Sequence, residues 1–417
     1  MANKRSVKVE VKRMPEKEKD KVILVGVETE ENFAIFDTSM DELRGLTKTA
    51  EGEIVFIMKQ KRPQIDRQTI LGKGKLEELK QLVDAYEANL VIFNHELTPR
   101  QGQTLTEELG VRVLDRVQLI LDIFAIRARS KEGKLQVSLA QLEYLLPRLT
   151  GMGTSMSRLG GGIGTRGPGE TKLEVDRRHI RNKITQIKNE LKEVKQHRER
   201  TRERRKDKQV YQIGLIGYTN AGKSTIMNIL TTANTYEQDQ LFATLDPLTK
   251  KWRLPEGFEM TITDTVGFIQ DLPTQLIDAF QSTLEESKSM DFLLHVVDAS
   301  AKNRLLHEKT VFDLMQQLDI MDIPVLTVYN KADLMKEEEF VPTLFPNVCI
   351  SAKSSKGKEA LMQAIKQQLM EQFDPFIVEL ADNQASEIYK YKRETIVTSQ
   401  DYDEEKQKYI ICGFRPK

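Results

Sequence analysis

The sequence contains little cysteine and no long apolar run. Its two cysteines, Cys349 and Cys412, have no neighbouring ligand residues, which argues against a disulfide framework or a zinc site and suits a reducing cytosol. No apolar run approaches the roughly 18 to 20 residues that span a bilayer. The first 20 residues lack the apolar centre of a signal peptide. We therefore expect a cytoplasmic protein, and because nothing predicts a dimer interface, a monomer.

The chain also has no net excess of positive or negative charge. The 63 basic residues balance 63 acidic ones, a result that alone argues against a nucleic-acid partner. The charges are segregated, however, since residues 177–208 hold fourteen Lys or Arg against five Asp or Glu. Such density predicts a surface that binds phosphates, whatever the net charge is.

The chain of 417 residues is long enough for two to four domains, and its first half predicts two of them. Residues 1–115 alternate apolar runs with helical patterns, which indicates a small parallel sheet covered by helices. The expected strands are 22–27, 54–60, 90–94 and 111–115, and the expected helices are 75–86 and 100–109.

Residues 116–208 predict an antiparallel helical hairpin, because two apolar stripes repeat at spacings of 4, 3, 4 and 3 around one connection. Pro147 should kink or end the first helix. The stripes consist of Leu135, Leu139, Leu142, Leu146 and Leu149, and of Ile180, Ile184, Ile187, Leu191 and Val194.

The second half predicts a doubly wound parallel sheet over 209–373 and a small α+β domain over 374–417. In the first of these, strand candidates at 212–216, 262–265, 292–300, 324–330 and 348–352 are mostly followed by helical stretches. The second reads as a strand, a polar helix and two more strands. The overall class is therefore multidomain α/β.

A glycine-rich motif of the form GxxxxGKS follows the strand at 212–216. The glycines let successive backbone N–H groups face a β-phosphate, while Lys223 adds a charge beside the β and γ oxygens and the Ser224 hydroxyl can ligate Mg²⁺. The predicted nucleotide-binding residues of this loop are Gly217, Tyr218, Thr219, Asn220, Ala221, Gly222, Lys223, Ser224 and Thr225.

Three further motifs follow in order, each after a strand. Asp264, Thr265, Val266 and Gly267 offer a carboxylate for the magnesium and an N–H for the γ-phosphate.

The last two motifs concern the base. An Asp at 333 accepts two hydrogen bonds that guanine can donate and adenine cannot. The stem of Lys331 would cover the base, and the backbone after the next strand would meet the guanine O6. The residues are Asn330, Lys331, Ala332 and Asp333, then Ser351, Ala352 and Lys353. Each motif alone also suits a turn or a helix start, but four in this order predict a GTPase.

A threonine that coordinates Mg²⁺ and senses the γ-phosphate should lie between the first two motifs. Thr244, within Phe242, Ala243, Thr244, Leu245 and Asp246, is our choice, and Thr231, Thr232, Thr235 and Thr249 are competitors. The predicted metal ligands are Ser224, Thr244 and Asp264. The predicted catalytic residues are Lys223, Thr244 and Gly267.

Phe268 stands where many regulatory GTPases carry a glutamine that orients the attacking water. We therefore expect slow intrinsic hydrolysis that a partner, a remodelled loop or a cation must complete. Asn220 resembles the asparagine that binds K⁺ in some GTPases lacking that glutamine, and a simple turn residue is the alternative.

The connection within the hairpin, about 148–170, has eight glycines between residues 151 and 169 and no acidic residue from 144 to 169. Glycines and arginines together can meet the crowded phosphates of folded RNA. The predicted RNA-binding residues are Arg158, Arg166, Arg177, Arg178 and Arg181. A flexible linker is the alternative interpretation.

These motifs together resemble the HflX family of ribosome-associated GTPases. The likeness rests on SRLGGGIGTRGPGETKLE, GYTNAGKST, FATLD, DTVGFI, NKAD and SAK, and on NHELTPRQ in the first domain. Leu248 departs from a more usual threonine, which leaves Thr244 as the better magnesium ligand.

The resemblance implies binding of GTP and GDP, of the large ribosomal subunit and its rRNA, and a role in separating stalled or stressed ribosomes. It also implies ATP binding by the N-terminal region, although that region has no phosphate-loop motif. The alternatives are a GTPase of ribosome assembly or tRNA modification, and an RNA-binding scaffold that only holds GTP.

Overall fold

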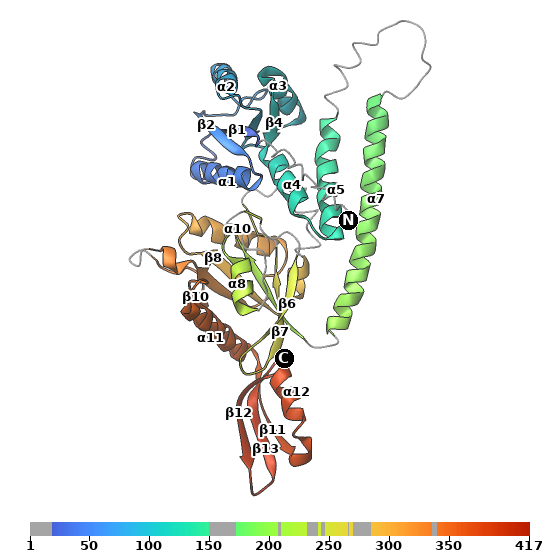
Figure 1. The fold of residues 1–417 in the computed structure, drawn as a ribbon, viewed down its shortest axis with the longest axis vertical. Coiled ribbons are helices and arrows are strands. Elements are labelled where there is room, and N and C mark those ends of the chain that lie inside the picture. The colour runs from blue at the N-terminus through green and yellow to red at the C-terminus, as the bar shows by residue number, and fades with distance from the viewer. Residues whose placement is uncertain are drawn as a thin grey trace, which may run out of the picture.

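The computed structural model arranges the chain as three sheets along one long axis, with a helical arm beside the upper part (Figure 1). The predicted class, multidomain α/β with parallel sheets, is confirmed. The structure describes residues 19–149, 172–206, 210–231, 241–242, 247–265, 267–269, 285–335 and 340–417, and the side chains of the longest helix for 174–197.

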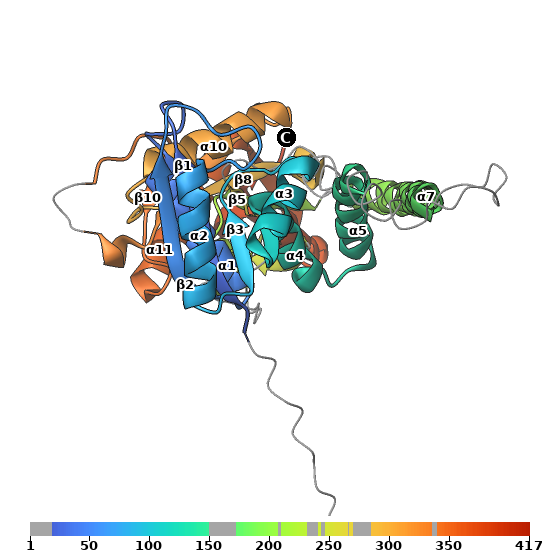
Figure 2. The same cartoon turned by 90° about the horizontal axis from the view of Figure 1, so that it is seen from above.

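The N-terminal sheet has four parallel strands in the order β2-β1-β3-β4. Alternate residues of β1 enter two different cores, because helices cover both faces (Figure 2). Helices α2 and α3 cover one face, and α1 and α4 cover the other. The elements are β1 (Lys21–Glu28), α1 (Phe36–Thr49), β2 (Glu53–Lys61), α2 (Lys73–Ala85), β3 (Leu90–Phe93), α3 (Pro99–Leu109) and β4 (Arg112–Asp115).

Helix α1 was not predicted, whereas the four strands and the two later helices were. Its apolar residues Phe36, Met40, Leu43 and Leu46 are buried at spacings of 4, 3 and 3, as an amphipathic helix requires. Gly45 and three threonines within the helix weaken its intrinsic propensity and obscure the pattern. Packing against the sheet outweighs that weakness.

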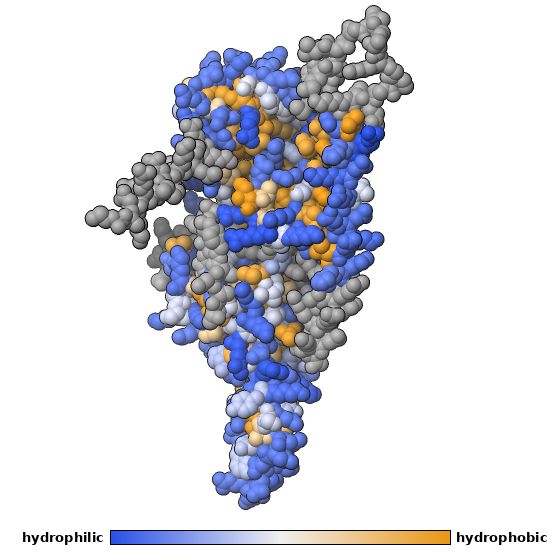
Figure 3. Space-filling model, turned by 45° about the vertical axis from the view of Figure 1, so that its right-hand side comes forward, coloured by the Kyte–Doolittle hydropathy of each residue, from blue (hydrophilic) through white to orange (hydrophobic). Residues whose placement is uncertain are grey.

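Helices α5 (Lys131–Arg148) and α7 (Lys172–Lys206) form the predicted antiparallel hairpin, which follows α4 (Arg116–Arg127). Ile187 is buried on α7, where its neighbours Gln186 and Lys188 are exposed, so the apolar stripe faces α5. Lys188 also forms an ion pair with Glu143 of α5, at 2.8 Å. Helix α5 ends one residue after Pro147, as expected. An apolar seam between polar flanks marks the hairpin on the surface (Figure 3).

The middle sheet has six strands in the order β10-β9-β8-β5-β7-β6. Five are parallel, and β6, which was not predicted, is an antiparallel edge strand paired with β7. The exposed positions of β6 include Lys251 and Arg253, and such charges are typical of an edge strand. The elements are β5 (Tyr211–Gly217), α8 (Lys223–Leu230), β6 (Leu248–Arg253), β7 (Glu259–Asp264), η1 (Glu285–Ser289), β8 (Phe292–Asp298), α10 (Arg304–Gln317), β9 (Val325–Asn330), η2 (Ala332–Leu334), β10 (Asn347–Cys349) and α11 (Ser355–Gln372).

The C-terminal sheet is antiparallel, in the order β11-β13-β12. Ile396 belongs to the core of the middle sheet, so the two domains share apolar packing at this end. The elements are β11 (Asp374–Ala381), η4 (Asp382–Gln384), α12 (Glu387–Glu394), β12 (Ile396–Asp403) and β13 (Lys408–Arg415). Within the part of the chain that the structure describes, no helix is long and apolar enough to cross a membrane.

Candidate functional site

The predicted phosphate loop connects β5 to α8 at the carboxyl edge of the middle sheet. Two of its glycines have backbones that other residues rarely adopt, with φ of 152° at Gly217 and 99° at Gly222. A Cβ at Gly217 would clash with the carbonyl oxygen of Val296, and one at Gly222 with the amide of Asn330. Only glycine therefore lets this loop lie so close to β8 and β9.

Lys223 begins α8 and is almost fully buried. Its Nζ donates hydrogen bonds to the carbonyl oxygens of Gly217, at 3.0 Å, and Tyr218, at 2.9 Å. Burial lowers the pKa of the Lys223 ammonium to about 8, against the opposing effect of the nearby Asp264 carboxylate. The ammonium thus lies inside the loop, where a phosphate would offer it stronger acceptors.

Ser224 and Asp264 meet although forty positions separate them, because β7 lies beside β5. The Ser224 hydroxyl donates to a carboxylate oxygen of the buried Asp264, at 2.8 Å. One hydroxyl and one carboxylate are oxygen ligands of the kind that Mg²⁺ prefers beside phosphates. Thr219, in the same loop, has a buried hydroxyl with no hydrogen-bond partner among the described residues. The residues present fit a magnesium nucleotide.

The segment after β7 packs directly on the phosphate loop. The Thr219 N–H donates to the Phe268 carbonyl, at 2.7 Å, and the Phe268 N–H donates to the Gly217 carbonyl, at 3.1 Å. A Cβ at Gly267 would lie 2.9 Å from the Lys223 ammonium. The ring of Phe268 is only 2% exposed and belongs to an apolar cluster with Ile216 and Leu293. It faces the core rather than any water beside a γ-phosphate.

The residues predicted to recognise the base come together at the ends of β9 and β10. The Asn330 amide donates to the Ala221 carbonyl, at 3.0 Å, and accepts from the Ala352 N–H, also at 3.0 Å. It therefore joins the phosphate loop to the last motif.

Beside it, Asp333 is exposed, and its pKa is lowered chiefly by a hydrogen bond from Ser351 and also by the charges of Lys353 and Lys331. Lys331 forms an ion pair with Asp298, at 2.8 Å. Asp298, which ends β8 and lies within the predicted strand 292–300, was not among the predicted site residues.

The site also contacts the N-terminal domain, which the sequence did not predict. Tyr218, Phe242 and Ile269 are buried in the same apolar core as α1 and α4. Phe242 meets the ring of Phe124 edge-on, with 4.6 Å between centroids. The segments GYTNAGKST, FATLD and DTVGFI thus each contribute one side chain to the core of a neighbouring domain. No local sequence pattern could reveal this contact.

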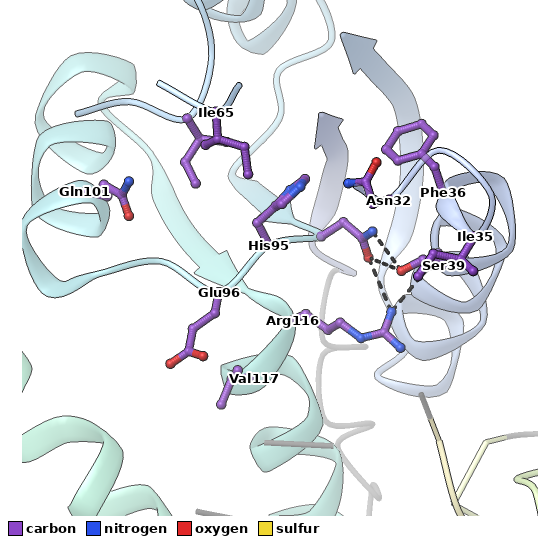
Figure 4. A pocket seen from close by; sticks show the side chains of 12 residues that line it. Asn32, Ile35, Phe36, Ser39, Ile65, His95, Glu96, Gln101, Arg116 and Val117 are labelled. Carbon is purple, nitrogen blue, oxygen red and sulfur yellow. Dashed lines mark hydrogen bonds between the residues drawn. The ribbon is translucent and has the colours of Figure 1, made fainter. Parts of the chain in front are cut away.

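A separate pocket of about 470 Å³ lies at the carboxyl edge of the N-terminal sheet (Figure 4). Phe36 and Ile65 supply apolar walls, while Ser39, Asn94 and Arg116 supply a connected polar group. The Asn94 amide bonds the Ser39 hydroxyl, and Arg116 donates to the Asn94 side-chain oxygen and the Ser39 carbonyl, each at 3.3 Å.

Some predicted residues lie outside the described residues: Ala243, Thr244, Leu245, Asp246, Val266, Arg158 and Arg166, with the competitors Thr232 and Thr235. Two other competitors are engaged elsewhere. The Thr231 hydroxyl bonds the Met227 carbonyl, and Thr249 pairs with Thr263 across two strands. Asn220 has a φ of 59°, as turn residues do. Arg177, Arg178 and Arg181 lie on α7 and Thr225 lies on α8, and the Thr265 hydroxyl donates to the Leu215 carbonyl of β5, at 2.7 Å.

A phosphate loop, a strand-end carboxylate and a guanine-type motif on one sheet edge define a class, the P-loop GTPases. Three families match the chain: residues 37–125 match one described as GTP-binding GTPase N-terminal, 127–205 one described as GTP-binding GTPase Middle Region, and 212–331 one described as 50S ribosome-binding GTPase.

Relatives define the family more narrowly. The GTPase HflX of Alkalihalophilus pseudofirmus is 50% identical over 94% of this chain and 93% of its own length. The GTPase HflX of Escherichia coli is 42% identical over 79% of both chains. The chain therefore belongs to the HflX family of GTPases. Among solved structures, a GTP-binding protein from Sulfolobus solfataricus in complex with GDP is 26% identical, with a TM-score of 0.45 over 84% of this chain and 98% of that one.

Proposed function

We propose that this GTPase binds the large ribosomal subunit, that the subunit stimulates its GTP hydrolysis, and that it promotes dissociation of stalled or stressed ribosomes. The α5–α7 hairpin carries the proposal. It connects through the basic glycine-rich segment at the end where α5 stops at Arg148 and α7 begins at Lys172. In Figure 1 that end lies away from the middle sheet.

The charge of α7 supports an RNA partner. Arg178 and Arg181 are exposed on the helix, and Arg178 lies on the side opposite the apolar stripe that faces α5. Phosphates of folded RNA attract such a surface through a term that depends on shape and charge more than on sequence. The family description of 50S ribosome binding for residues 212–331 points to the same partner.

For the nucleotide, we infer that Lys223 and the phosphate loop hold the β and γ phosphates, and that Asp333 and Ser351 recognise guanine. Ser224 and Asp264 would hold Mg²⁺, with Thr244 as the third ligand. When bound, the ion neutralises charge on the β and γ oxygens. A potassium ion beside Asn220 is a further proposal. Because Phe268 is buried, the attacking water must be oriented from elsewhere, and we assign that to contact with the ribosome.

The test is GTP turnover with and without purified large subunits, with small subunits as the control. We expect strong stimulation by large subunits alone. Equal rates in all three mixtures would contradict the proposal. A chain with a shortened 158–169 segment should bind GTP normally and yet lose the stimulation and the separation of intact ribosomes in a sedimentation assay.

The base assignment has its own test. Asp333→Asn replaces two charge-assisted acceptors, so GTP affinity should fall by about 100-fold and preference should shift towards xanthine nucleotides. Asp313→Asn, an exposed carboxylate on α10, is the matched control and should change neither. A competition assay with both nucleotides measures the shift, and an unchanged preference refutes the role of Asp333.

A further inference from the structure

The second residue of the phosphate loop is held by another domain. The Tyr218 side chain leaves the loop and is 7% exposed. Its hydroxyl donates a hydrogen bond to Glu42 of α1, at 2.5 Å. An O–H donor facing a carboxylate makes one of the stronger hydrogen bonds in proteins. A side chain of the phosphate loop therefore hydrogen-bonds to a buried carboxylate of the N-terminal domain.

Glu42 is itself fixed. Its other carboxylate oxygen pairs with Arg116, and the side chains of this ion pair are 8% and 5% exposed. Arg116 is held in turn by the Ser39 carbonyl and the Asn94 side chain (Figure 4). These residues come from α1, the end of β3 and the start of α4. The carboxylate that receives the Tyr218 hydroxyl thus belongs to a rigid network.

The loop side of Tyr218 is equally constrained. The ring stacks on His307 of α10, with centroids 3.9 Å apart and planes 11° from parallel. The Tyr218 carbonyl accepts from Lys223, and the neighbouring Thr219 N–H is bonded to Phe268. Displacement of Tyr218 would therefore move the groups that face the phosphates.

We propose that Glu42 is a positioning residue of the GTPase site, which acts through the Tyr218 hydroxyl to preorganise the phosphate loop. Binding a nucleotide to a loop that is already ordered avoids the entropic cost of ordering it. The N-terminal domain would thereby contribute to GTP affinity through Glu42, a residue outside the phosphate loop. The proposal rests on the phosphate loop as the nucleotide site, which Lys223→Ala tests separately through loss of binding.

Tyr218→Phe removes the hydroxyl and leaves the ring and the Glu42–Arg116 pair in place. We expect the KM for GTP to rise about three- to tenfold, the effect of one lost hydrogen bond, with kcat changed less than about twofold. Tyr211→Phe is the control, because that hydroxyl bonds Gln372 on the far side of the same domain, at 3.3 Å. An unchanged KM, a KM shift shared by Tyr211→Phe, or a change in kcat alone overturns the proposal.

Glu42→Gln tests the other partner, with its melting temperature as a check on folding. In the wild-type background it should raise the KM, because a neutral amide accepts more weakly than a carboxylate. In the Y218F background it should add less than about a twofold change, since the bond is already absent. Additive effects would show that Glu42 acts by another route and would overturn its positioning role.

Discussion

The N-terminal sheet is parallel and the middle sheet is mainly parallel, and the carboxyl edges of the two are built in opposite ways. At the middle sheet the edge depends on close backbone approach, because Gly217 and Gly222 leave no room for a Cβ. At the N-terminal sheet the edge is made of side chains, with Ser39, Asn94 and Arg116 bonded to one another beside a pocket. Both edges are the place where such sheets bind ligands.

The difference teaches what each edge depends on. A backbone edge is fixed by conformation, so it fails when a side chain is added. A side-chain edge is fixed by charge and hydrogen bonds, so it fails when a partner is removed. At the middle sheet, adding a methyl group to a glycine should therefore be the more damaging kind of substitution. At the N-terminal sheet, removing a charged or hydrogen-bonding partner should be the more damaging kind.

The largest effect should come from Arg116→Met at the N-terminal edge. It leaves the buried Glu42 without its cation, a change that typically costs about 3–5 kcal/mol. Hydrogen exchange of the α1 and β3 amides would measure the lost free energy of opening. Arg44→Met breaks an exposed pair with Asp41 and should cost less than about 1 kcal/mol. Equal losses in the two variants would remove the charge-based account of this edge.

Gly222→Ala tests the backbone edge. The added methyl group would clash with the Asn330 amide, so the loop must shift to avoid it. In addition, the φ of 99° at Gly222 is strained for any residue with a Cβ. Because strain of this kind costs about 1–3 kcal/mol, GTP affinity should fall by up to about 100-fold. Gly74→Ala in α2, where no described atom outside the helix's own backbone lies within 4 Å of a new Cβ, should leave affinity unchanged. Equilibrium binding of a fluorescent GTP analogue decides the matter, and a tolerant Gly222 would refute the account.

The same contrast explains what could be predicted from the sequence. The backbone edge must place glycines, a lysine and a serine at fixed spacing, so its motif is legible in one short segment. The polar group at the N-terminal edge draws on positions 39, 94 and 116, and only the fold brings them together. For the same reason the Tyr218–Glu42 contact, which spans 176 positions, left no local signal.

The fold shows a similar division. Strongly apolar strands and the long stripes of the hairpin were predictable, because their periodicity reflects burial directly. Helix α1 and strand β6 were not, since tertiary packing supports α1 despite weak propensity and β6 is a charged edge paired on one side only. The burial of Phe268 was likewise beyond the sequence, which showed only that no glutamine is there.

A pH titration sharpens the account of the backbone edge. The Lys223 pKa of about 8 means that the free protein loses this charge above that pH. Bound phosphates favour the ammonium and raise its pKa, so GTP binding takes up a proton above pH 8. Affinity should be flat from pH 7 to 8 and then fall by up to about tenfold per pH unit. In Lys223→Arg the cation persists, so affinity, though weaker, should lack this fall. Parallel curves for the two proteins would contradict the assignment.

The smallest expected effect comes from two glycines of the N-terminal domain that have similar free space around them but different backbone conformations. Gly102 and Gly110 in and after α3 both have open space around a new Cβ, but only Gly110 has a left-handed φ, of 69°. Gly102→Ala should stabilise the domain by about 0.5–1 kcal/mol, because alanine favours the helix and restricts the unfolded chain. Gly110→Ala should destabilise it by about 1 kcal/mol, since the left-handed backbone penalises a Cβ. Hydrogen exchange of the α3 amides would show both signs. If the two variants changed stability in the same direction, conformation would not be what this domain requires of glycine, and the contrast with Gly222 would rest on space alone.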